Sequence, residues 1–111
     1  MKEIKVSSQK VIWTQHSRFK LRQYNFSEKR VLRIIRRPHR VEEGIVEGTI
    51  AAMQRAGTKK NPKEVWAMYQ LLKNKNGLTI KIISAWRYPG VTPENERPQI
   101  PEDTLKELGI L

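Results

Sequence analysis

Residues 64–86 read EVWAMYQLLKNKNGLTIKIISAW, two apolar segments on either side of the turn sequence Asn74-Lys75-Asn76-Gly77. An Asn-Gly pair tolerates the positive φ angles that a tight hairpin turn requires. Residues 78–86 alternate with the period of a strand, and Ile82-Ile83 places apolar side chains on both faces, as in a central strand. Aromatic and β-branched residues in 64–73 favour a strand there over a helix. The stretch therefore predicts an antiparallel hairpin at the centre of a sheet.

Two helices are expected before this hairpin. Thr14 and Ser27 are good N-cap residues, and they predict helices over residues 15–24 and 28–37, the second ended by Pro38. An apolar stripe at helical spacing marks the core side of the second helix: Val31, Leu32, Ile34 and Ile35. In the first helix, Phe19 with Leu21 or Tyr24 is expected to contact the core.

The remaining segments complete the expected order of elements. Residues 1–10 are predicted as a tail or edge strand, 39–48 as a loop and 49–55 as a strand. Helices first and an antiparallel meander after predict an α+β fold, with two N-terminal helices packed on an antiparallel sheet of three to four strands. The domain would span residues 11–88. Residues 89–111, rich in proline, would form an extension with a short helix over 102–108, docked on the sheet edge or on a second copy.

The charge of the chain is unevenly distributed. The 111 residues carry a net charge of +11, and residues 1–40 alone hold twelve Lys or Arg against two Glu, a balance of +10. Such a basic surface suits a polyanion, with nucleic acid as the first choice. The alternatives are a solubilising surface or a basic patch for an acidic protein partner.

Several classes of protein are excluded by composition. The absence of cysteine excludes a disulfide scaffold, a cysteine-ligated metal site and a thiol nucleophile. No apolar run approaches the ~18 residues that span a bilayer, and the charged start has no apolar segment typical of a signal peptide. We therefore expect a cytoplasmic protein, without a membrane partner.

Basic side chains are what remains for chemistry, because no metal-ligand pattern, carboxylate pair or glycine-rich phosphate loop is present. Metal-free RNA cleavage needs a base, an acid and cations around the phosphorane, and these roles suit His, Lys and Arg. His16 and Lys20 share one face of the first predicted helix, and Arg18 and Arg22 share another. The alternative for His16, alone after an N-cap, is a purely structural hydrogen bond.

The second helix and the last strand offer further contacts. Arg30, Arg33 and Arg36 or Arg37 lie opposite the apolar stripe, where they can contact phosphate or simply face solvent. Trp86-Arg87-Tyr88 ends the last strand. Tyr69 is expected mainly in the core, with base stacking as the lesser alternative.

Residues 14–27, TQHSRFKLRQYNFS, resemble a signature of the BrnT-like and RelE-like bacterial toxin superfamily, roughly T-x-H-A-x-x-R-M-x-x-R-x-I-S. Residues 31–38 fit the helix that follows it. Residues 82–85, IISA, resemble the last strand of BrnT-type chains, I-I-S-A-R. The resemblance covers about residues 11–88 and implies a small α+β RNase-toxin fold.

The resemblance also implies residue roles. His16 matches the signature histidine, Lys20 stands where arginine is usual, and Tyr24 replaces a second arginine. Trp86 stands at the position of the strand arginine, whose role Arg87 would take over. The implied protein is a metal-independent endoribonuclease, the toxin of a toxin–antitoxin pair, with RNA, free or on the ribosome, and an acidic antitoxin-like protein as partners and no cofactor.

The predicted site combines both lines of reasoning. His16 would act as general base or acid, and Lys20, Arg22 and Arg87 would stabilise the phosphate charge. The residues predicted to contact nucleic acid are Arg18, Arg30, Arg33, Arg37 and Tyr69. The alternatives are a non-catalytic nucleic-acid-binding module and a protein-interaction domain whose basic surface is neutralised by an acidic partner.

Overall fold

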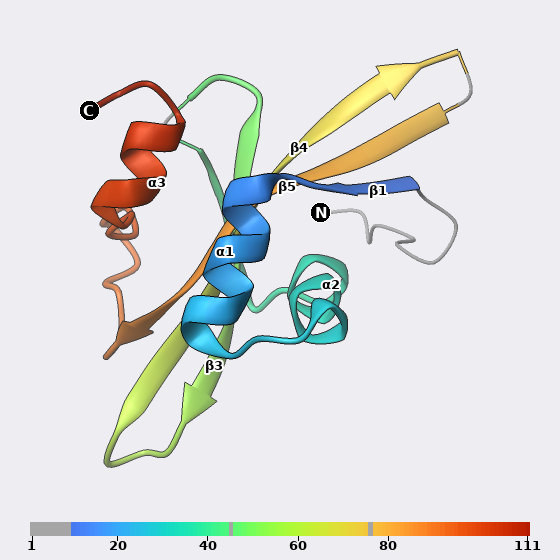
Figure 1. Cartoon of the computed structure of the whole chain (residues 1–111). Helices are drawn as coiled ribbons and strands as arrows, with labels where there is room; N and C mark the ends of the chain where they lie inside the picture. The colour runs from blue at the N-terminus through green and yellow to red at the C-terminus, as the bar shows by residue number, and fades with distance from the viewer. Residues whose placement is uncertain (1–9, 45, 76) are drawn as a thin grey trace.

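The structure is a computed structural model that describes residues 10–44, 46–75 and 77–111 (Figure 1). Its elements are β1 (Lys10–Trp13), α1 (Gln15–Tyr24), α2 (Glu28–Arg36), β2 (Arg40–Glu43), β3 (Thr49–Gly57), β4 (Pro62–Asn74), β5 (Gly77–Pro89) and α3 (Glu102–Glu107). The predicted α+β class is confirmed. The sheet, however, has five strands in the order β1-β5-β4-β3-β2 and is mixed, not an antiparallel sheet of three to four strands.

The two outer strands account for this difference. β1 pairs parallel with β5, with Lys10 beside Thr79, and β2 pairs antiparallel with β3, with Arg40 beside Met53. The prediction of a loop over residues 39–48 is therefore wrong for β2. Each outer strand has four residues, too few for a period of two to be recognised, and each is ordered by main-chain bonds to its longer neighbour. Residues 1–9 of the predicted tail lie outside the described residues.

Both predicted helices and their caps are confirmed. α1 has the predicted bounds, and α2 is one residue shorter than predicted. The Thr14 side chain accepts a hydrogen bond from the Ser17 N–H at 3.0 Å, and the Ser27 side chain accepts one from the Arg30 N–H at 3.1 Å. Phe19 does not contact the core as expected, since its side chain is 49% exposed.

The central hairpin is also confirmed. β4 and β5 pair antiparallel from Lys63 beside Pro89 to Asn74 beside Gly77, and Gly77 has a φ of 116°. Asn76, the other half of the predicted Asn-Gly signal, lies outside the described residues. The two strands carry most of the core, so the sequence that forms this hairpin also sets the two faces of the sheet.

A β-bulge in β5 exchanges those faces. Ile82 pairs with Tyr69 and Ser84 with Met68, which leaves Ile83 as the extra residue. Ser84 and Ala85 are therefore reversed relative to simple alternation. Beyond the bulge, Ala85 belongs to the core cluster of Ile82, whereas Trp86 belongs to the cluster of Ile83.

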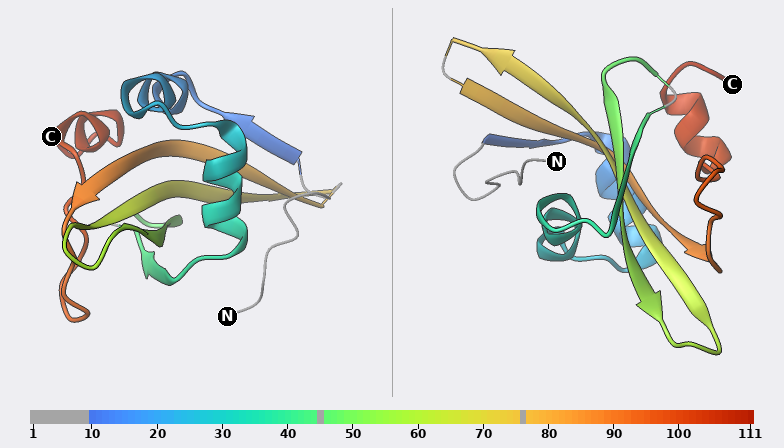
Figure 2. Two further views of the ribbon diagram at one scale, coloured as in Figure 1. Left: turned by 90° about the horizontal axis from the view of Figure 1, so that it is seen from below. Right: turned by 180° about the vertical axis from the view of Figure 1, so that it is seen from behind.

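Helices cover both faces of the sheet (Figure 2). α2 packs on one face, over the core cluster that contains Val31, Ile34, Ile35, Ala52, Val65, Ala67, Tyr69, Ile80 and Ile82. The C-terminal arm, residues 90–111 with α3, lies on the other face, where Ile100 and Leu108 pack against Trp66, Met68 and Trp86. α1 runs beside β5 and follows directly from β1, because the Thr14 N–H donates to the Ile82 carbonyl.

Candidate functional site

Lys20 on α1 is almost fully buried, with 1% of its surface exposed. Its ammonium group donates to both carboxylate oxygens of Asp103 on α3, at 2.9 and 3.0 Å, and lies 5.0 Å from the centre of the Tyr24 ring. The Asp103 side chain is 41% exposed. The helix face predicted to meet phosphate is thus occupied, in this structure, by a carboxylate of the same chain.

His16 contacts the next residue of α3. Its Nε2 atom lies 3.2 Å from the hydroxyl of Thr104, which lies 2.8 Å from the hydroxyl of Ser84 on β5. Partial burial acts to raise the pKa of Asp103, but the hydrogen bonds and charge of Lys20, with His16 nearby, outweigh it and lower that pKa below its usual value. His16 and Lys20 therefore share one side of α1, as predicted, and α3 covers them both.

Arg87 lies on the other side of Tyr24, against an aromatic pair. The rings of Tyr24 and Phe26 stack with their centres 5.4 Å apart, and the Arg87 guanidinium lies 5.9 Å and 5.0 Å from those centres. Burial and the Asp103 carboxylate raise the pKa of Tyr24, and Arg87 opposes them. Because the bulge turns Trp86 toward the C-terminal arm, Arg87 takes the place beside α1 and α2.

A second guanidinium approaches the same ring. Arg30 lies 5.2 Å from the centre of Phe26, and burial together with the charges of Arg87 and Arg33 lowers the pKa of Arg30. In the part of the chain that the structure describes, none of these three arginines is ion-paired with a carboxylate. Arg30, Arg33 and Arg87, called here the guanidinium cluster, thus gather like charges without an internal counter-ion.

Other predicted site residues lie apart from this cluster or are engaged elsewhere. Arg22 is exposed on α1, and Arg37 is exposed at the C-terminal end of α2. Arg18 is ion-paired with Glu28 at 3.1 Å, which links the two helices. Tyr69 is 1% exposed in the core on the α2 side, where burial raises its pKa, so its ring offers no surface for base stacking.

Arg40 and Glu64, which the sequence analysis did not select, anchor the C-terminal arm. Arg40 donates to Glu42 at 2.8 Å and to the carbonyls of Thr92 and Glu96 at 3.0 and 2.6 Å. Glu64 is 1% exposed and accepts from the N–H and hydroxyl of Thr92 and from the indole of Trp66. An acid placed directly before the apolar Val65-Trp66 was the available signal of a buried, hydrogen-bonded carboxylate.

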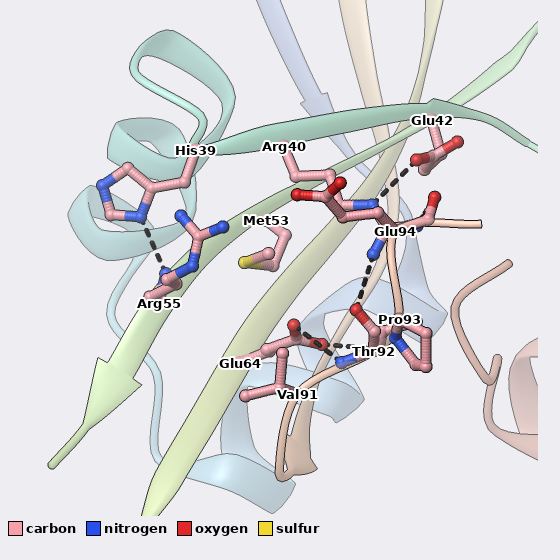
Figure 3. A pocket seen from close by; sticks show the side chains of 10 residues that line it. All are labelled: His39, Arg40, Glu42, Met53, Arg55, Glu64, Val91, Thr92, Pro93 and Glu94. Carbon is pink, nitrogen blue, oxygen red and sulfur yellow. Dashed lines mark hydrogen bonds and ion pairs between the residues drawn. The ribbon is translucent and has the colours of Figure 1, made fainter. Parts of the chain in front are cut away.

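These two residues also line a cavity of about 450 Å³ between β2, β3 and residues 91–94 (Figure 3). His39 and Arg55 stand on its opposite side, where the Arg55 N–H donates to His39 Nδ1 at 2.9 Å. None of the predicted site residues lines this cavity. Its buried polar groups are satisfied by the arm itself, so we assign the cavity a structural origin.

Among residues 10–44, 46–75 and 77–111, no three His, Asp or Glu side chains gather as a metal site requires. No helix within the same ranges is long and apolar enough to cross a membrane. Comparison of the chain with models of protein families, with curated proteins and with solved structures found no match.

Proposed function

We propose that this protein is a cytoplasmic, RNA-directed domain of the toxin type, and that the guanidinium cluster is its phosphate-binding surface. The observation that carries the proposal is the gathering of Arg30 and Arg87 on one aromatic ring with no carboxylate partner among the described residues. Like charges held close together repel, and a bound anion relieves that repulsion. A phosphodiester is an anion that suits this arrangement.

The chemistry of arginine supports phosphate as the ligand. Guanidinium groups that rest on ring faces keep their planar N–H edges available for two parallel hydrogen bonds to phosphate oxygens. The resemblance of residues 14–27 to the toxin signature makes RNA the polyanion of choice. An acidic antitoxin-like protein would bind the same surface and mask it.

Cleavage is the second part of the proposal. His16 would take the proton from the 2′-hydroxyl or give one to the leaving oxygen, and Lys20, Arg22 and Arg87 would stabilise the phosphorane charge. In support, His16 and Lys20 lie on one side of α1, and Lys20 and Arg87 both contact the Tyr24 ring. Such a mechanism requires no metal ion.

Binding is tested with a labelled single-stranded RNA and fluorescence anisotropy over a range of salt concentrations. We expect the double variant Arg30→Gln/Arg87→Gln to bind more weakly, with a salt slope reduced by roughly two, about one for each lost phosphate contact. The matched control, Lys59→Gln/Lys60→Gln in the turn between β3 and β4, removes the same charge and should keep the parental slope. Equal losses in both variants would mean that only net charge matters.

Cleavage is tested by incubating the purified protein with RNA in EDTA. We expect products from the parent and a loss of at least ~100-fold in rate for His16→Ala, the usual contribution of a general acid or base. Absence of products, or an unchanged rate in the variant, would contradict the mechanism and leave a non-catalytic RNA-binding module.

A further inference from the structure

The interface between α3 and the pair α1–β5 is unusually polar for a buried surface. Four polar or charged residues here have 1% or less of their surface exposed: Ser17, Lys20, Ser84 and Thr104. Thr104 is the one buried residue of α3. Buried polar groups contribute little net stability compared with apolar packing. Something other than stability therefore explains why this surface is lined with them.

The way Asp103 meets Lys20 resembles the binding of an oxyanion. Two carboxylate oxygens lie 2.9 and 3.0 Å from the ammonium group, and the hydroxyl of the next residue lies 3.2 Å from His16. A phosphate presents two anionic oxygens with similar spacing to the same donors. Asp103 thus stands where an external phosphate would stand if α3 moved away.

The structure also indicates that α3 is the separable partner. Lys20 is 1% exposed, whereas the Asp103 side chain is 41% exposed, so the cation is buried and its counter-ion reaches it from outside. α3 has only six residues, and a helix of that length is not stable without its packing. Once it leaves, the polar groups beneath it can bind water, which an apolar surface could not do.

We infer that the surface of α1 and β5 beneath α3 is a second phosphate-binding site, and that Asp103 closes it as an internal substitute for the ligand. A phosphate group that binds Lys20 and His16 displaces Asp103 and α3. This inference rests on the proposed function, because it assigns the regulation of the same surface. Its ligand class is a phosphate group, either free or as a phosphodiester of RNA.

The first experiment measures how fast Lys20 is acylated by a small amine-reactive reagent, followed by mass spectrometry of the whole protein after digestion. Asp103→Asn removes the counter-ion and should raise the rate roughly tenfold or more, because an unpaired buried ammonium favours the open form. Glu102→Gln makes the same change of charge on the exposed part of the same helix and should leave the rate near that of the parent.

The same assay tests the ligand. Inorganic phosphate should slow the acylation of Lys20 in the Asp103→Asn variant, compared with chloride at equal ionic strength. If Asp103→Asn and Glu102→Gln react at the same rate, or if phosphate gives Lys20 no more protection than chloride, the inference is overturned. Lys81, on the exposed part of the sheet, provides an internal reference for each sample.

A lock on α3 gives an independent test. The hydroxyl oxygens of Ser84 and Thr104 are 2.8 Å apart, so two cysteines at these positions can reach the ~2.05 Å of a disulfide bond, and the chain has no other cysteine. Oxidised Ser84→Cys/Thr104→Cys should bind labelled RNA several-fold more weakly than the same protein after reduction. Ser84→Cys alone should respond to neither treatment. Equal affinity in the oxidised and reduced forms overturns the inference.

The two proposals fail in different ways. If phosphate protects Lys20 but no form of the protein binds RNA, the proposed function is wrong and the closed phosphate site remains. If RNA binds through Arg30 and Arg87 while phosphate does not protect Lys20, the proposed function remains and the inference is wrong.

Discussion

α2 and α3 cover opposite faces of one sheet by different kinds of interaction. α2 buries Val31, Ile34 and Ile35, each no more than 2% exposed, in a core cluster of apolar residues. α3 buries Thr104 and reaches the rest of the protein through polar contacts, among them the ion pair of Asp103 with Lys20. The apolar interface resists water, whereas the polar one can exchange a protein partner for water or an anion. The comparison predicts that α2 holds the fold together and that α3 controls access to α1.

The largest expected effect lies on the α2 side. Ile34→Ala removes a side chain that is 0% exposed and leaves a cavity, which should lower the free energy of unfolding by ~2–5 kcal/mol. The measurement is urea denaturation followed by tryptophan fluorescence. Arg36→Ala, on the exposed side of α2, should change it by less than ~0.5 kcal/mol. A loss below ~1 kcal/mol for Ile34→Ala would remove the distinction between the two interfaces.

The α3 side should respond unequally to changes in its two charges. Asp103→Ala leaves the buried ammonium of Lys20 without a counter-ion and should lower the stability by about 1–3 kcal/mol, less than for a fully buried pair because Asp103 is partly exposed. Lys20→Met fills the same space without a charge and leaves Asp103 in contact with water. We expect that variant to stay within ~1 kcal/mol of the parent.

The same urea experiment checks both variants side by side. Equal losses for Asp103→Ala and Lys20→Met would mean that the pair acts as a simple attraction. A larger loss for Lys20→Met would contradict the assignment of Lys20 as the buried member of the pair.

Much of the α2 half of this comparison was predictable from sequence. Helix caps at Thr14 and Ser27, the stripe of α2 and the hairpin turn are local signals, each contained in fewer than about ten residues. β1 was not predictable, because its partner on β5 is some 69 residues away and only the fold brings the two strands together. The bulge at Ile83 was hidden for a related reason, since two adjacent isoleucines also fit an ordinary central strand.

The α3 half was largely out of reach of the sequence. His16, Lys20 and Arg87 were selected from their spacing and from the resemblance, and the structure brings all three close to Tyr24 or α3. Asp103 was not selected, because its contact with Lys20 spans 83 positions of the chain and no local pattern encodes it. Tyr69 was selected from its type, but its place on a central strand put it in the core.

Acid and alkali should both loosen α3. The pKa of Asp103 is lowered in the fold, so its contribution to stability is complete above the ordinary pKa of ~3.9 and is lost as pH falls through the lowered value. The pKa of Tyr24 is raised, so its contribution is complete below the ordinary pKa of ~10 and is lost as pH rises through the raised value.

The methyl resonance of Thr104 in an NMR titration reports this docking directly. We expect one transition below pH ~3.9, absent in Asp103→Asn, and one above pH ~10, absent in Tyr24→Phe. Methyl resonances of Ile34 on the α2 side should stay unchanged at pH values where that of Thr104 moves. Parallel transitions at both positions would show that the two helices unfold together.

The smallest effect is expected at the other ion pair of α1, which joins Arg18 to Glu28. Both side chains are about half exposed, 52% and 51%, so water and salt screen the attraction strongly. Arg18→Ala should lower the free energy of unfolding by less than ~0.5 kcal/mol, and the difference should vanish in about 1 M salt, where the Debye length is ~3 Å. Asp103→Ala should keep most of its effect in the same salt, because Lys20 is buried. Urea denaturation of both variants at low and high salt therefore separates burial from charge as the cause: a loss above ~1 kcal/mol for Arg18→Ala, or equal salt sensitivity of the two variants, would mean that the position of Lys20 beneath α3 confers nothing that an exposed pair lacks.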